Sequence, residues 1–232
     1  MITTKTTHLL KTLIAGAALT VMGVNAFAVA IDATAAMQGT AGSAGLAGSF
    51  WQEPHHSTNY DVNVVKNDML SARTGSFVST QVNYNGVDLS SITAFLGADG
   101  GSYSGPAGNL DDGIVGVKGF LRIDAPMSLT FHLRHDDVGG FSIGNQTLIS
   151  QTCCGTDTVT ADFSTAGFYA IDAFFANTAT PNSEGGAVFT LTADSAMPFY
   201  QDMAPVPEPE TYAMLLAGLG VLGCVTRRRK TL

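Results

Sequence analysis

Positive charge is scarce in the central part of this chain, residues 29–206. This part holds 17 acidic residues and only five basic ones, which are Lys66, Arg73, Lys118, Arg122 and Arg134. A surface with this balance repels polyanions, which excludes nucleic acid and an anionic membrane surface as partners. The same excess of carboxylates suits a soluble protein and the binding of divalent cations.

Cysteine is also rare. Of three cysteines, Cys224 lies in an apolar run near the C-terminus, while Cys153 and Cys154 are adjacent. Adjacent Cα atoms lie about 3.8 Å apart, below the roughly 4.4–6.8 Å of ordinary disulfides. Three states therefore stay open, namely a vicinal disulfide, intermolecular bridges, and unbridged or modified thiols. The pair lacks the ligand spacing of a structural zinc site.

The motifs of common catalytic sites are missing as well. The chain has no Gly-x-Ser-x-Gly, His-Glu-x-x-His or phosphate-binding loop. Glu53, His55 and His56 are better explained by a polar turn, because adjacent side chains diverge in a strand. A glycosidase pair of carboxylates depends on their separation in space, which the sequence does not give. We expect a protein that is not an enzyme.

The N-terminus has the three parts of a secretory signal peptide. Lys5 and Lys11 form a weakly basic region, residues 13–24 are apolar, and Ala26 and Ala28 provide small residues at a cleavage position. This pattern predicts cleavage after Ala28 and export through the Sec translocon. Residues 1–28 are therefore left out of the fold prediction.

The C-terminus carries a second three-part pattern. Pro207-Glu208-Pro209 precedes an apolar run, residues 212–226, and the basic cluster Arg227, Arg228, Arg229 and Lys230 follows it. As a helix the apolar run is about 22 Å long, short for a bilayer core of about 30 Å. On physical grounds it is either a transient transmembrane signal or an ordinary tail anchor, with the basic cluster in the cytoplasm.

The order of these three parts resembles the PEP-CTERM sorting signal of Gram-negative bacteria. The resemblance implies recognition by an exosortase, a membrane-embedded cysteine protease-transpeptidase, after transient insertion in the inner membrane. It also implies cleavage near Pro207, Glu208 and Pro209 and delivery to the cell surface or extracellular matrix. Residues 207–232 would then be an address that says little about the rest of the protein.

Between the two signals the sequence predicts one all-β domain. Short segments alternate in polarity or are rich in β-branched and aromatic residues, and glycine, asparagine and aspartate separate them. The strand segments are 120–123, 129–134, 141–143, 158–163, 168–175 and 187–192. Their spacing predicts an antiparallel β-sandwich or barrel over residues 45–194. We expect a flexible lead-in at 29–44, a short helix after a serine cap within 90–96, and a linker at 195–206.

Several motifs in this domain resemble, in order, those of the protective-antigen-type β-sandwich, the PA-fourteen domain. The motifs are Gly45-Leu46-Ala47-Gly48-Ser49-Phe50-Trp51, Gly119-Phe120-Leu121, Asp136-Asp137, Phe141-Ser142-Ile143-Gly144-Asn145, Gly167-Phe168-Tyr169 and Gly185-Gly186. The resemblance covers residues 46–194. The middle segment, residues 82–108, and Cys153-Cys154-Gly155 depart from the family pattern.

The resemblance implies a calcium site. In the adhesins of this family two paired aspartates, here Asp136 and Asp137, hold Ca²⁺, often across a cis peptide bond. An asparagine, here Asn177, completes the ligand set, and the ion binds sugar hydroxyls. These oxygen ligands are those that Ca²⁺ prefers, although Asp-Asp-x-Gly-Gly is also a good turn sequence. The resemblance thus implies a surface or matrix module that binds polysaccharide with Ca²⁺. The alternative is a purely structural matrix protein.

Overall fold

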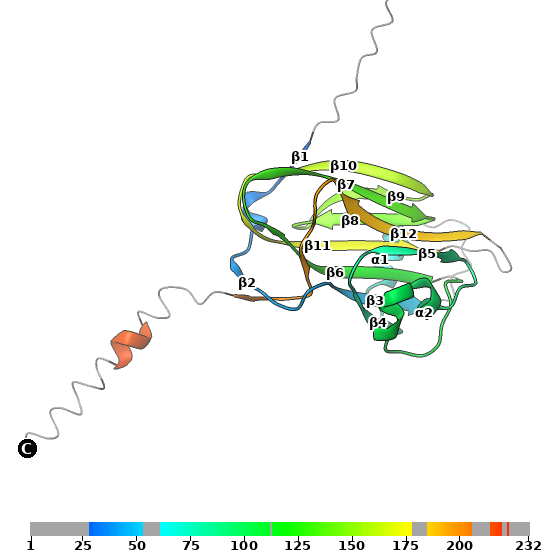
Figure 1. Ribbon diagram of the computed structural model, residues 1–232, viewed down its shortest axis with the longest axis horizontal. Helices are drawn as coiled ribbons and strands as arrows, with labels where there is room; N and C mark the ends of the chain where they lie inside the picture. The colour runs from blue at the N-terminus through cyan, green and yellow to red at the C-terminus, as the bar shows by residue number, and fades with distance from the viewer. Residues whose placement is uncertain are drawn as a thin grey trace, which may run out of the picture.

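The computed structural model describes residues 28–52, 61–111, 113–177, 185–205, 214–219 and 222. It confirms the predicted antiparallel β-sandwich, whose two sheets are stacked in Figure 1. The first sheet has the order β1 (Val29–Ile31), β10 (Gly155–Phe163), β7 (Met127–Asp136), β12 (Gly186–Ala193) and β5 (Asn83–Val87). The second has the order β4 (Gly75–Ser79), β3 (Leu46–Gln52), β6 (Gly113–Ile123), β11 (Gly167–Ala176), β8 (Val138–Ile143) and β9 (Gln146–Gln151), with β13 (Phe199–Tyr200) also pairing with β6.

The predicted strand segments all lie within observed strands. Residues 120–123 belong to β6, 129–134 to β7, 141–143 to β8, 158–163 to β10, 168–175 to β11 and 187–192 to β12. The predicted Gly144–Asn145 turn joins β8 to β9, and both residues have positive φ, 55° and 68°. A two-residue turn of this kind matches the right-handed twist of paired strands, which explains the glycine and the asparagine.

The core lies between the two sheets and is rich in aromatic residues. Every second residue of β7 from Leu129 to His135 is buried, as the alternation of a half-buried strand requires. Phe131 and Phe141 have ring centroids 5.1 Å apart, and Phe175 stacks on Phe189 at 6.1 Å. Full burial of one such side chain stabilises the fold by about 1.5–3 kcal/mol, so this interface is the main source of stability.

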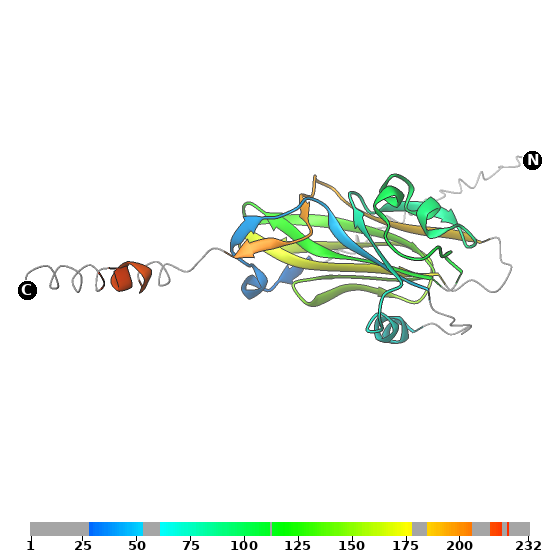
Figure 2. The same cartoon turned by 90° about the horizontal axis from the view of Figure 1, so that it is seen from below.

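Helix α1 (Val62–Asp68) covers part of the outer face of the second sheet. It begins after Asp61, whose carboxylate accepts a hydrogen bond from the Asn63 amide and so caps the helix. Val62 and Val65 are buried in a second apolar cluster that includes Trp51. In Figure 2, α1 and helix α2 (Ile92–Phe95) lie on opposite sides of the sandwich.

The middle segment, which departs from the family pattern, has its own polar network. The predicted short helix is confirmed as α2, capped by Ser91 and followed by the 3₁₀ helix η2 (Gly97–Ser102). Asp99 of η2 is buried and accepts hydrogen bonds from the Thr80 amide, the Thr80 hydroxyl and the Tyr84 hydroxyl. Because three donors satisfy this carboxylate, it ties η2 to β5 and to the end of β4.

The lead-in and the linker are more ordered than the sequence predicts. In the lead-in, β1 pairs in parallel with β10 and buries Ile31, and the 3₁₀ helix η1 (Ala33–Ala35) follows it. The lead-in strand β2 (Gly39–Ala41) also pairs with the linker strand β14 (Met203–Pro205). The expectation of a flexible lead-in and a plain linker was therefore wrong. The order of these segments comes from backbone pairing and from the buried Ile31 side chain, and the Ala- and Gly-rich composition does not indicate it.

The two export signals fall almost entirely outside the described residues. Among their described parts, residues 214–219 and 222 are helical. Within the described ranges no helix has the length and apolar character needed to cross a membrane. The predicted signal peptide up to residue 27, the Pro-Glu-Pro triple and the arginine cluster lie outside these ranges, so the predictions made for them stand as predictions.

Candidate functional site at one end of the sandwich

The candidate site lies where the chain crosses from one sheet to the other. Asp136 is the last residue of β7, in the first sheet, and Val138 begins β8, in the second. The peptide bond between Asp136 and Asp137 is cis, as the family resemblance implies. The two aspartates therefore occupy the passage between the sheets at the end of the sandwich.

Strand register brings three further segments to these aspartates. Asp136 pairs with Val188 of β12. Continuing the pairing of β10 with β7 by one step places Cys154 opposite Asp136. Asn177 directly follows β11, whose last residue, Ala176, pairs with Val138 at the start of β8. The predicted ligands Asp136, Asp137 and Asn177 therefore lie at the same end of the sandwich, although Asn177 is distant in sequence.

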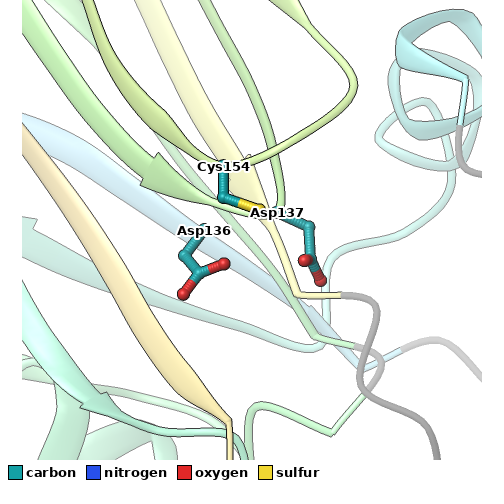
Figure 3. Close-up of side chains that lie close together, drawn as sticks. All are labelled: Asp136, Asp137 and Cys154. Atoms are coloured by element: carbon teal, nitrogen blue, oxygen red, sulfur yellow. The ribbon is translucent and has the colours of Figure 1, made fainter.

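Asp136, Asp137 and Cys154 form a compact group of potential ligands. Each offers one ligand atom, and these atoms all lie within 4.8 Å of one another. Figure 3 shows Cys154 reaching from the β9–β10 connection towards the two aspartates. A cavity of about 250 Å³ opens beside them, lined by Arg134, His135, Asp136, Cys154, Thr156 and Val188 among others.

A buried histidine holds the backbone of the turn. His135 is 1% exposed, and its Nδ1 donates a hydrogen bond to the carbonyl oxygen of Asp137 at 2.7 Å. Its Nε2 lies 2.8 Å from a carboxylate oxygen of Asp157, whose other oxygen accepts from Gln151. A Cβ added at Gly139 would lie 2.3 Å from the imidazole, so only glycine leaves room for this ring. The histidine therefore fixes the position of Asp137 from within the core.

Asn177 is also fixed from within the core. It is 2% exposed, and its Nδ2 donates to the Leu110 carbonyl at 2.9 Å and to Asp88 at 3.3 Å. These hydrogen bonds fix the orientation of the side-chain amide through its nitrogen. The asparagine therefore has a defined orientation, which a metal ligand requires.

Asp88 is a site residue that the sequence prediction missed. It follows β5, is 4% exposed, and donates its backbone N–H to the Gly185 carbonyl at 3.1 Å. A Cβ at Gly185 would lie 2.5 Å from the Asp88 carboxylate, and the Asp136 carboxylate lies 3.5 Å from a Cβ built at Gly186. Gly185 thus lets the Asp88 carboxylate approach the chain closely, whereas the distance at Gly186 is an ordinary contact. Asp88 belongs to the segment without a family match, and the strand before it, β5, was not predicted, so no signal in the sequence indicated it.

The electrostatics of Asp136 reflect this concentration of carboxylates. Burial raises the pKa of Asp136, and the negative charges of Asp137 and Asp88 raise it further. A hydrogen bond from the Cys154 thiol and the proximity of His135 act in the opposite direction. Ionised carboxylates held together at a partly buried position are destabilised, and a divalent cation relieves that cost.

Cys153 and Cys154 are exposed and form no disulfide in this structure. Their Sγ atoms lie 2.6 Å apart. The hydrogen bond with Cys153, together with partial burial, raises the pKa of the Cys154 thiol to about 11. The thiol is therefore protonated at neutral pH when no metal ion is bound. A vicinal bridge between Cys153 and Cys154 stays a prediction.

The Asp111 carbonyl, just before β6, accepts a hydrogen bond from the Gln52 side chain. Glu53, His55 and His56 lie outside the described residues.

Comparison with known proteins supports both resemblances. The family described as the PEP-CTERM protein-sorting motif matches residues 205–230. The motif marks the chain as an exported protein that is anchored in the membrane before processing. A search of curated proteins found no match.

Two solved structures show the fold. The PA14 domain of the antifreeze protein MpAFP is 22% identical, with a TM-score of 0.54, over 72% of this chain and 93% of that one. The PA14 sugar-binding domain of an RTX adhesin is 20% identical, with a TM-score of 0.52, over 71% of this chain and 100% of that one. The chain therefore combines a PEP-CTERM sorting motif with a β-sandwich of the PA14 type.

Proposed function

We propose that the exported domain is a calcium-dependent carbohydrate-binding module of the cell surface or extracellular matrix. The observation that carries the proposal is the convergence of oxygen ligands at one end of the sandwich. Ligand atoms of Asp136 and Asp137 lie within 4.8 Å of each other, and Asn177 follows β11 at the same end of the sandwich. The RTX adhesin domain, which shares the fold, is a sugar-binding domain.

The donor set fits Ca²⁺. This ion takes six to eight oxygen ligands, commonly carboxylates and amide carbonyls. Asp136, Asp137 and the Oδ1 atom of Asn177 would hold it, and Asp88 adds negative charge behind Asn177. When bound, the ion would offer its remaining coordination positions to vicinal sugar hydroxyls. The protein supplies a rigid frame for this, because His135 and Leu110 fix the turn and the amide.

The position of the site suits display at a surface. The sorting motif begins at residue 205, the last residue of β14, and β14 pairs with β2. Gly39 and Ala41 of β2 border a cavity with Ile123 and Gly167, near the start of β7. Asp136 ends β7, and ten extended residues span about 33 Å. The sorting motif therefore begins at one end of the sandwich and the candidate site lies at the other (Figure 1), so a domain held by its C-terminal end directs the site outward.

Export and processing complete the proposal. The signal peptide directs the chain to the Sec translocon, and the C-terminal segment inserts transiently in the inner membrane of a Gram-negative bacterium. An exosortase then releases the domain near Pro207, Glu208 and Pro209. The domain acts by binding, as the sugar-binding domain that shares its fold does.

A glycan array tests the binding function. The exported protein is applied with calcium and with a chelator, and Asp137→Asn is the matched variant. We expect calcium-dependent signals that the variant lacks. Binding that ignores both calcium and the substitution would refute the cation site, and the absence of any glycan signal would favour a structural matrix protein instead.

Intact-mass analysis of the secreted protein tests the processing. We expect a chain that begins at Val29 and lacks the apolar run and the arginine cluster. Recovery from the cell surface of a chain that still ends in Leu232 would contradict exosortase processing.

A further inference from the structure

The set of potential ligands at the candidate site includes sulfur as well as oxygen. Cys154 lies with Asp136 and Asp137 in the group whose ligand atoms are within 4.8 Å of one another. The cysteine comes from the β9–β10 connection and the aspartates from the β7–β8 turn, so two separate parts of the chain supply the set. The cavity beside the group is lined by both Asp136 and Cys154. A calcium site built only of oxygen does not explain this cysteine.

The donor chemistry distinguishes two classes of ion. Ca²⁺ is a hard cation that takes oxygen ligands. Zn²⁺ and the softer Cd²⁺ favour thiolate sulfur and also accept carboxylate oxygen. The sequence argument against zinc considered only the spacing of Cys153 and Cys154. The fold brings carboxylates to Cys154, so that spacing is no longer the relevant criterion.

We propose that Cys154 gives this site a second, redox-controlled metal specificity. In the dithiol state Asp136, Asp137 and Cys154 bind a thiophilic divalent cation such as Zn²⁺. In the disulfide state Cys154 is joined to Cys153, its sulfur is withdrawn from the ligand set, and the oxygen ligands bind Ca²⁺. The inference rests on the proposed function, since it assigns a regulation to the same carboxylates.

Both chemical steps balance. Metal binding breaks the S–H bond of Cys154, forms a metal–sulfur bond and releases one proton to the solvent. Oxidation uses a small-molecule disulfide, such as oxidised glutathione. The two cysteines form one S–S bond and lose two electrons and two protons, and the small disulfide takes them up and leaves as two thiols. The Sγ atoms of Cys153 and Cys154 are already adjacent, 2.6 Å apart.

Two single variants separate the roles of the cysteines. Cys153→Ser keeps the sulfur that lies among the carboxylates but cannot form the vicinal disulfide, so it is fixed in the metal-binding state. Cys154→Ser removes that sulfur and leaves the oxygen ligands intact. Because the two residues are adjacent and both exposed, each variant controls for the effect of the other on folding.

The experiment titrates the secreted protein with Cd²⁺, Zn²⁺ and Ca²⁺, under a phosphine reductant and after oxidation by oxidised glutathione. Absorbance reports the sulfur-to-cadmium charge-transfer band, and calorimetry reports affinity. We expect the band at one equivalent in the reduced protein and in Cys153→Ser. We expect no band in Cys154→Ser or in the oxidised protein, and Zn²⁺ binding weaker by at least about tenfold in both.

Three results would overturn the inference. Equal cadmium bands in the two serine variants would show that Cys154 has no special place. An unchanged cadmium affinity in Asp137→Asn would show that the thiols bind without the carboxylates. An unchanged Zn²⁺ affinity after oxidation would remove the redox control. Failure of calcium binding in every state, with the expected cadmium result, would instead refute the proposed function.

Discussion

We expect Asp137→Asn to melt above the wild type in the presence of a chelator and below the wild type in the presence of calcium. Ligand atoms of Asp136 and Asp137 lie within 4.8 Å of each other. Two unit charges at that separation repel by about 3.5 kcal/mol at an effective dielectric constant near 20. Both side chains are partly exposed, so water reduces the effect. We expect Asp137→Asn to stabilise the calcium-free protein by about 1 kcal/mol, which raises its melting temperature by roughly 2–4 °C.

Calcium should reverse this order. At a concentration a hundredfold above the dissociation constant, a ligand that binds only the folded state adds about 2.7 kcal/mol to its stability. For a domain of this size that amounts to roughly 5–11 °C, which the wild type gains and Asp137→Asn does not. The assay is thermal melting of the secreted protein by circular dichroism, with calcium or with chelator.

A charge control accompanies this experiment. Asp124→Asn also removes one negative charge, but Asp124 lies in the β6–β7 turn, at the far end of β7, in an exposed ion pair with Arg122. It should leave the calcium shift unchanged. The reasoning is refuted if the wild type shows no calcium shift, if Asp137→Asn keeps the full shift, or if Asp137→Asn melts below the wild type in chelator.

Three further predictions concern the frame of the site and the core. His135→Ala removes two buried hydrogen bonds and leaves a cavity, so urea unfolding should show a loss of about 3 kcal/mol together with weaker calcium binding; unchanged stability would contradict the role of the histidine. Tyr84→Phe leaves buried Asp99 without one donor and should cost about 1–2 kcal/mol in the same assay, with calcium binding unaffected. Gly140→Ala would place a Cβ 2.3 Å from the Phe174 ring and should lower the free energy of unfolding by about 1–3 kcal/mol. The control Gly101→Ala, where a Cβ would meet no atom within 4 Å, should leave it almost unchanged. Equal effects of the two alanines would show that close packing at Gly140 is unimportant.

The strands could be predicted from the sequence because their signal is local. Alternation of buried and exposed residues in segments such as 129–134, and a Gly-Asn turn at 144–145, report the backbone conformation directly. The lead-in could not be predicted in this way. Its strand β1 owes its order to a partner, β10, that lies more than a hundred residues away.

The candidate site likewise contains residues that the sequence predicted and residues that it did not. Asp136 and Asp137 are adjacent in sequence, so the pair was available to a comparison of motifs, and Asn177 followed from its place in the family pattern. Asp88 lies in a segment that matches nothing in the family. The sequence argument against a zinc site used only the spacing of Cys153 and Cys154. That spacing does not indicate the carboxylates that the fold brings to Cys154.

The sequence by itself thus determined six of the strands, the paired aspartates and the C-terminal sorting motif, because each depends on residues that are neighbours along the chain. Only the tertiary structure decided which residues share the end of the sandwich. The pairing of whole strands brings Cys154 to Asp136 and Asp137, and it brings the Asn177 amide to the Asp88 carboxylate. Register is set by which side chains fill the core between two whole sheets, and no short stretch of sequence contains that information.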